Sequence, residues 1–315
     1  LADFYKTFTY EKSGLALKGD SGTDGFFIQA PFSGSGLKDN FSESDLENQA
    51  IEFRIKPFRL ETNQHLFSLS GSVNHYHDQH IIAIPHTGND ISSSGDAKQY
   101  GSLRYLSGTT TINTTEIFPL YNGDFWDVFL NASKFTGTGA THSSSIEFGA
   151  YQANFNKNIS KYVSSGIVSS STSHYSNTFG LSSNRAKHMF FGGIPANSSA
   201  GYNLVDGLTY SGSLQEIRYY VKENLTDSTL KKHALEPFMY AGNTISSSYD
   251  NLVLRLPLGS NDQQDSSSFH PNIDISFLGM DDGVSSSMAS QEWEETIQNH
   301  YHPTPDTVGI SMTSE

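Results

Sequence analysis

The sequence contains no cysteine among its 315 residues. Without thiols the chain cannot form disulfides, thiolate metal sites or a cysteine nucleophile, and this absence favours assembly in the cytosol. Basic residues are also scarce, since 19 Lys and Arg stand against 33 Asp and Glu, and the formal net charge is −14. Binding of nucleic acid requires clustered cations that neutralise phosphates. We therefore expect no nucleic-acid partner.

Long apolar runs are missing as well. No stretch reaches the roughly 20 residues that a membrane-spanning helix needs, and no signal peptide opens the chain, so no membrane partner is expected. The sequence has neither a Gly-x-Ser-x-Gly nucleophile motif nor a phosphate-binding glycine loop of standard spacing. The chain begins with Leu1, and its last residues do not resemble a natural terminus. We expect it to be a segment of a longer protein.

Aromatic residues, by contrast, are abundant, with 21 Phe and 16 Tyr to supply a core. The dominant pattern is short apolar–polar alternation between Gly-, Ser- and Asn-rich turns, which indicates β-strands. Strands are predicted at residues 25–30, 50–57, 65–70, 80–85, 102–106, 125–130, 146–155, 189–192, 214–221 and 252–258. One short helix is predicted at residues 226–235, because Thr226 can cap its first turn and Pro237 ends it. The expected fold class is all-β: a two-sheet antiparallel jelly-roll sandwich with one short helix and an extended C-terminal arm.

The same alternation predicts which side chains fill the core. In residues 51–55 the apolar side chains stand at every second position, so they share one face of the strand. Residues 214–221 alternate less regularly, and their pattern does not settle the register. The predicted core residues are Ile51, Phe53, Ile55, Trp126, Phe129, Phe148 and Ile217.

The composition changes near Gly259. Residues 1–258 carry the strand and helix signals and are predicted to form one jelly-roll domain. Residues 259–315 are rich in Ser, Asp, Gln and Asn, which is typical of an extended arm or of a linker to a further domain. Phe277 and Trp293 are the places where this arm is expected to dock on a neighbour.

Two segments carry a resemblance to a known fold family. Residues 122–130 (NGDFWDVFL) and 212–220 (GSLQEIRYY) resemble the Trp-x-Val strand and the late Glu-Ile-Arg strand of concanavalin A-like, laminin-G-like jelly rolls. In that family a short helix follows the late strand, as Leu225 and the residues after it suggest here. The resemblance covers roughly residues 10–240 and implies a β-sandwich.

A narrower resemblance concerns the end of the chain. Residues 250–259 with 269–271, and the ending at 303–310, are similar to segments of large structural proteins of tailed, marine-type bacteriophages. This resemblance implies a non-enzymatic structural module of a virion, in its capsid, neck, baseplate or fibre. The implied partners are other virion proteins and copies of this chain, and the implied location is the virion, assembled in the host cytoplasm.

A second hypothesis is a carbohydrate-binding module for host attachment, with host surface glycans as partners. It requires exposed aromatic and polar side chains on which a sugar ring can stack. The candidate ligand-binding residues are Tyr100, Tyr105, His174 and Tyr175. Singly exposed aromatic residues, however, are more often edge or interface residues.

A third hypothesis is a jelly-roll glycoside hydrolase. Glu43, Asp45 and Glu47 have the Glu-x-Asp-x-Glu spacing of such enzymes, and alternate residues of a strand share a face, as a nucleophile and an acid/base require. The segment lacks the apolar neighbours that raise a carboxyl pKa. A solvated acidic turn is the favoured interpretation, and no catalytic residue is predicted.

Histidines form the densest set of potential metal ligands. His75, His77 and His80 lie between two predicted strands, and His300 and His302 repeat the His-x-His spacing. Imidazole is a good ligand for transition metals, and such pairs could meet on the axis of a trimeric fibre. The favoured alternative is an exposed polar hairpin tip, so no cofactor is expected.

Overall fold

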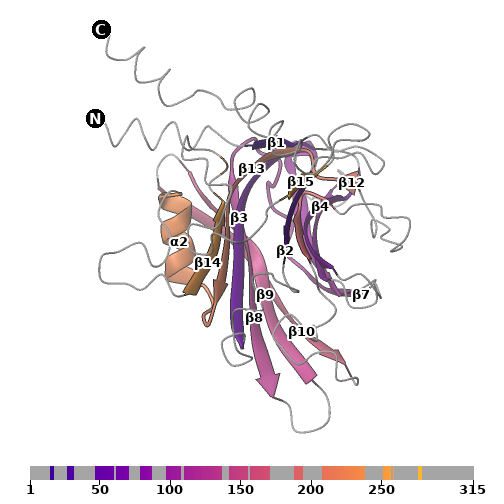
Figure 1. The fold of residues 1–315 in the computed structure, drawn as a ribbon. Coiled ribbons are helices and arrows are strands. Elements are labelled where there is room, and N and C mark those ends of the chain that lie inside the picture. Colours follow the sequence, from indigo (N-terminus) through magenta and orange to yellow (C-terminus); the bar gives the residue numbers. More distant parts are fainter. Residues whose placement is uncertain are drawn as a thin grey trace.

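The computed structural model describes residues 15–17, 27–31, 47–59, 62–70, 79–86, 97–107, 110–136, 142–154, 157–170, 188–193, 208–237, 251–256, 258 and 276–278. Within these residues the strands form one seven-stranded and one eight-stranded sheet that lie face to face (Figure 1). Strand pairing is antiparallel except for one short contact. The predicted all-β, two-sheet sandwich with a short α-helix is confirmed.

The two sheets draw strands from along the chain. The seven-stranded sheet contains β1 (Leu15–Leu17), β3 (Asn48–Pro57), β8 (Trp126–Thr136), β9 (His142–Ala153), β10 (Ile159–Ser170), β13 (Gly212–Val221) and β14 (Leu252–Leu256). The eight-stranded sheet contains β2 (Phe27–Pro31), β4 (Gln64–Ser70), β5 (Gln79–Pro85), β6 (Gly101–Ser107), β7 (Thr110–Thr114), β11 (His188–Phe191), β12 (Leu208–Thr209) and β15 (Ser276–Leu278). Their orders are β1-β13-β3-β8-β9-β10, with β14 on β13, and β15-β2-β11-β4-β5-β6-β7, with β12 on β4.

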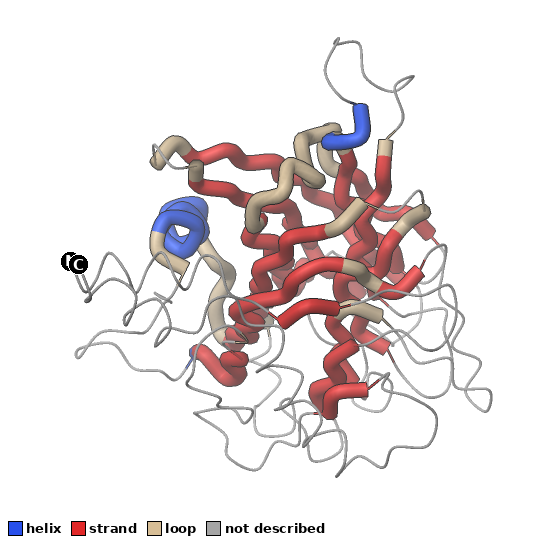
Figure 2. The backbone as a smooth tube through the Cα atoms, turned by 90° about the horizontal axis from the view of Figure 1, so that it is seen from above, coloured by secondary structure: helices blue, strands red, loops and turns tan. Residues whose placement is uncertain are grey.

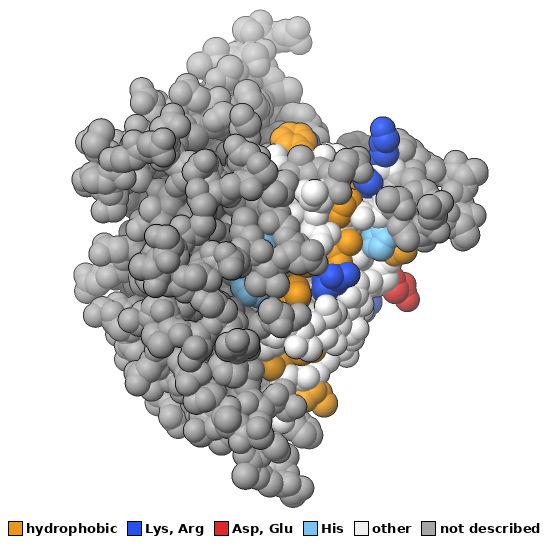
Figure 3. All heavy atoms as spheres, turned by 90° about the vertical axis from the view of Figure 1, so that its right-hand side faces the viewer, with side chains coloured by type: hydrophobic (Ala, Val, Ile, Leu, Met, Phe, Trp, Pro, Cys, Tyr) orange, Lys and Arg blue, Asp and Glu red, His pale blue; other side chains and the backbone are white. Residues whose placement is uncertain are grey.

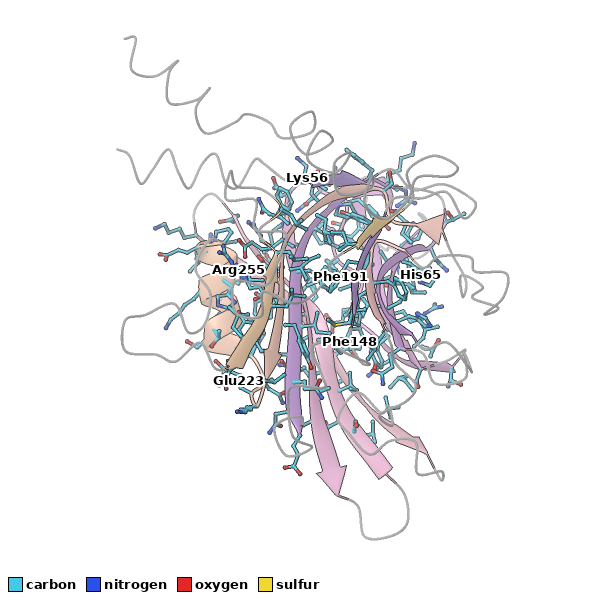
Figure 4. All side chains as sticks on the ribbon, viewed as in Figure 1. Lys56, His65, Phe148, Phe191, Glu223 and Arg255 are labelled. Atoms are coloured by element: carbon cyan, nitrogen blue, oxygen red, sulfur yellow. The ribbon has the colours of Figure 1, made fainter. Side chains whose placement is uncertain are left out.

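Apolar side chains of both sheets meet in one core between them. Figure 4 shows Phe148 and Phe191 in this interior, one from each sheet. The rings of Phe53 and Phe191 meet edge to face with their centres 5.6 Å apart. Six of the predicted core residues lie here, all completely buried: Ile51, Phe53, Ile55, Trp126, Phe148 and Ile217.

The helix α2 (Asp227–Leu235) covers the outer face of the seven-stranded sheet, against β8, β9 and β10 (Figure 2). As predicted, Thr226 caps it, accepting a hydrogen bond from the backbone N–H of Thr229. Phe129 is buried beneath α2 and not in the central core. Since Trp126 and Phe129 are three residues apart, a strand directs them to opposite faces. Both are buried because this sheet is covered on both sides.

Some elements were not predicted. β10 is twelve residues long and pairs with β9 over its whole length, yet its Ser-rich sequence hides the alternation. β15 belongs to the predicted C-terminal arm but pairs with β2, and Phe277 lies opposite Ile28 of the same chain. Three residues of this arm are therefore part of the sandwich.

The irregular alternation in β13 has a structural cause. Between Gln215 and Arg218 the pairing with β3 shifts, so that two residues of β13 face a single residue of its partner. Glu216 takes up this bulge with a φ of 48°. As a result Ile217 faces the core while Glu216 and Arg218 both lie in the buried polar region described below.

Candidate functional site

Of the predicted sugar-binding residues, Tyr100 and Tyr105 are described by the structure, and they lie in different environments. Tyr105 is completely buried, with its ring 5.7 Å from that of Phe148 and its hydroxyl donating to Gln79. It cannot belong to an exposed platform, because its position in β6 directs it into the core. Tyr100 is half-buried at the start of β6. His174 and Tyr175 lie outside the described residues.

Of the predicted metal ligands His75, His77 and His80, the described part of the chain includes His80. His80 is buried in β5, where its Nδ1 lies 2.9 Å from the Ser68 hydroxyl, and its ring meets that of His65 edge on. It is therefore not at an exposed hairpin tip. His75 and His77 lie outside the described residues, as do His300 and His302. Among the residues that are described, no three potential ligands gather around a common point.

The predicted acidic motif is described only at one position. Glu47 is exposed and precedes β3, whereas Glu43 and Asp45 lie outside the described residues. The spacing of the three carboxylates therefore stays a feature of the sequence alone.

A different surface stands out at one end of the sandwich. Three chain segments meet there: the residues after β3, the residue after β5, and the short 3₁₀ turn η4 (Ala97–Gln99) before β6. We call this surface the Arg59 loop end, and it consists of Phe58, Arg59, His86, Lys98, Gln99 and Tyr100.

Arg59 joins these three segments through its guanidinium group. Nη1 donates to the carbonyl oxygens of Lys98 at 3.1 Å and of Tyr100 at 3.3 Å, and Nη2 donates to that of His86 at 2.9 Å. Its guanidinium carbon also lies 5.7 Å from the centre of the Tyr121 ring. Because one rigid, planar group contacts three backbone carbonyls, the segments are fixed relative to one another.

The side chains of the Arg59 loop end combine apolar and polar groups. Phe58 is 57% exposed although it is a large hydrophobic residue. Lys98 and Gln99 are exposed, while the imidazole Nε2 of His86 lies 2.9 Å from the Ser102 hydroxyl. Aromatic faces with hydrogen-bonding groups beside them are suited to a polar ring-shaped ligand such as a sugar. Figure 3 shows the side of the molecule that carries the eight-stranded sheet, where hydrophobic, basic and His side chains are interspersed.

A second polar region is enclosed between the seven-stranded sheet and α2. Arg218 is completely buried and donates to Glu52 at 3.0 Å, to Glu216 at 2.9 Å and to the carbonyl of Pro237, just after α2. Arg255, which lies on the α2 side of β14 (Figure 4), binds the same Glu216 with Nη2 at 2.5 Å. We call the group formed by Glu52, Arg54, Asp127, Glu216, Arg218, His233 and Arg255 the buried charge network.

The buried charge network connects α2 to the sheet. His233 of the helix lies with Nδ1 2.8 Å from a Glu52 oxygen. Burial alone would raise the pKa of Glu52, but the charges of His233 and Arg218 outweigh it and hold this pKa at about 2. At the other end of α2, the Tyr151 hydroxyl donates to Asp227 at 2.8 Å. Its carboxylates Glu52, Asp127 and Glu216 are at most 1% exposed, so the network holds the helix on the sheet and does not offer a surface to a ligand.

The fold places the chain in the class of antiparallel jelly-roll sandwiches, here with one sheet covered by a helix. No helix in the described part has the length and apolar character needed to cross a membrane. No protein-family profile matches the sequence, and neither does any curated protein.

Solved structures show similarity at low sequence identity. A heptameric SAP-like pentraxin from Limulus polyphemus is 10% identical with a TM-score of 0.42, covering 86% of this chain and 97% of its own. The CBM40 module of a Ruminococcus gnavus sialidase is 13% identical with a TM-score of 0.38, covering 71% and 97%. Domains LG4-5 of the mouse laminin α1 chain are 13% identical with a TM-score of 0.37, covering 70% and 45%. These similarities concern the fold alone.

Proposed function

We propose that this chain is a non-catalytic jelly-roll module that binds carbohydrate through a surface including the Arg59 loop end. The observation that carries the proposal is Phe58, a mostly exposed aromatic ring on segments that Arg59 holds in place. A rigid surface loses little conformational entropy when a ligand binds, so even modest stacking and hydrogen bonding contribute to affinity. Tyr100, Lys98 and Gln99 are the further side chains of the Arg59 loop end that offer polar groups to a ligand.

The absence of catalysis is part of the proposal. Acyl or glycosyl transfer requires acid or base groups that reach a substrate. In the described part of the chain, the carboxylates Glu52 and Glu216 are bound by arginines and are completely buried. A position in a virion stays a prediction from the sequence resemblance alone.

Replacing Phe58 or Tyr100 with alanine is expected to weaken glycan binding about tenfold or more, because central aromatic residues carry much of the affinity of a binding surface. A glycan array with the unmodified chain identifies the ligand, and titration calorimetry then measures the dissociation constant of each variant. Ile167→Ala serves as the matched control, since Ile167 is 59% exposed but lies on β10. Absence of saturable binding on the array, or equal losses in all three variants, would contradict the proposal.

A further inference from the structure

Asp127 occupies an unusual position in the buried charge network. It lies on β8 in register with Arg54 of β3 on one side and with Tyr151 of β9 on the other. The carboxyl group is 1% exposed, and its Oδ1 lies 2.9 Å from the Nε of Arg54. Arg54 is shared, because its Nη1 donates to Gln215 at 2.9 Å and its guanidinium lies over the Phe125 ring. The buried carboxyl group of Asp127 therefore pairs with a cation that is shared with other partners.

Glu52 lies on the same face and has much stronger partners. It stands two residues from Arg54 on β3 and receives both Arg218 and His233. Three carboxyl groups, those of Glu52, Asp127 and Glu216, therefore share one enclosed region, and its cations other than Arg54 contact Glu52 or Glu216. Burial raises the pKa of Asp127 to about 6, against the attraction of Arg54, and the negative charge of Glu52 adds to the rise.

We propose that Asp127 is a proton switch beneath α2: when its carboxyl group releases its proton to solvent, the packing of the helix on the sheet loosens. Two attachments of α2 border Asp127. The Tyr151 side chain, opposite Asp127 in the sheet, holds Asp227 at the start of the helix, and Glu52 holds His233 near its end. A new negative charge at Asp127 competes with Glu52 for Arg218 and His233.

The direction of the pH effect follows from linkage. The pKa of Asp127 is higher in the folded protein than the ordinary value of 3.8. A group of this kind stabilises the folded state below its unfolded pKa, and this contribution disappears as the pH rises through the folded pKa. The packing of α2 is therefore tightest in mild acid and weakens towards neutral pH. The charged or titratable groups that face Asp127 are Arg54 and Glu52 on β3, Arg218 on β13, Tyr151 on β9 and His233 on α2.

Amide hydrogen exchange of α2 tests the switch. After correction for intrinsic rates, protection of the α2 amides is expected to fall about tenfold between about pH 5 and about pH 7.5 in the unmodified chain. Asp127→Asn is expected to keep high protection at both pH values, because it keeps the shape and removes the charge. Asp124→Asn changes an exposed aspartate just before β8 and is expected to behave as the unmodified chain does.

A second measurement needs no variant. The carboxyl carbon of Asp127, followed by NMR in the unmodified chain, is expected to titrate with a midpoint above about pH 5. A midpoint near the ordinary aspartate value would overturn the proposal. So would pH-independent protection of α2, or a pH dependence that persists in Asp127→Asn, since the latter would assign the effect to a different group.

Discussion

Replacing Arg218 with methionine is expected to lower the free energy of unfolding by about 3–5 kcal/mol, the range for breaking a buried ion pair from one side. Methionine fills most of the volume but leaves Glu52 and Glu216 buried with fewer cations. It also removes the donor to the Pro237 carbonyl, which fixes the chain after α2. The penalty is therefore mainly the desolvation of two carboxylates that have lost a partner.

Urea unfolding followed by tryptophan fluorescence measures this loss, because Trp126 lies completely buried in the central core, on the strand that also carries Asp127. Lys161→Met is the matched control, since it breaks an ion pair with Asp227 in which both side chains are about half exposed. Exposed pairs contribute little, so its unfolding midpoint is expected to stay nearly unchanged. Arg218→Lys is not expected to restore stability, because an ammonium group cannot reach three acceptors in one plane. Equal midpoints for Arg218→Met and Lys161→Met would show that the network does not stabilise the fold.

The sequence predicts the sandwich well where strands alternate. Ile51, Phe53 and Ile55 identify the core face of β3 because their odd positions are apolar while Glu52 and Arg54 lie between them. The same pattern suggests that Glu52 and Arg54 face water, and this inference is wrong. Alternation indicates that the two faces of a strand differ in polarity. It does not indicate that a helix at residues 227–235 covers the polar face and buries it.

The Arg59 loop end was less accessible from sequence. Arg59 contacts the carbonyls of residues 27 to 41 positions away, and such contacts leave no local pattern. Tyr100 was a candidate because an aromatic side chain at the surface can stack on a sugar ring. Tyr105 was chosen on the same ground, but it is buried. The position of a residue within a strand, and not its residue type, decides whether its side chain is exposed. Phe58 carries no distinguishing signal, as an aromatic residue after a strand usually enters the core.

The irregular apolar–polar pattern of residues 214–221 reflects the bulge in β13. A strand without the bulge would also place Glu216 and Arg218 on one face and Ile217 on the other. Its pairing with β3 beyond Gln215, however, would be in a different register. The bulge sets Arg218 opposite Glu52, and the positive φ of Glu216 turns its carboxylate between Arg218 and Arg255. The network thus depends on a backbone feature that hydrophobic periodicity cannot encode.

Gly149 in β9 is expected to be the most sensitive glycine of the helix-covered face. A Cβ atom at this position would lie 2.1 Å from the carbonyl oxygen of Tyr162 and 2.8 Å from the Cα of Val163, both on β10. These are backbone atoms, so no side-chain rotation can relieve the contact, and β10 must move away from β9. Gly149→Ala is therefore expected to cost about 3 kcal/mol, the upper end of the usual range for overpacking.

Gly166→Ala is the control, because its Cβ would meet the Cγ2 methyl group of Ile112 at 2.7 Å, which is a side-chain contact and not a contact with backbone. Urea unfolding should show a clearly larger loss of stability for Gly149→Ala than for Gly166→Ala. Since Val163 packs beneath α2, the displaced β10 also withdraws part of the apolar surface on which the helix rests. Exchange of the α2 amides should accordingly rise in Gly149→Ala at every pH, unlike the effect of Asp127, which depends on pH. If the two alanine variants are equally stable, the close approach of β9 and β10 at Gly149 does not constrain the fold.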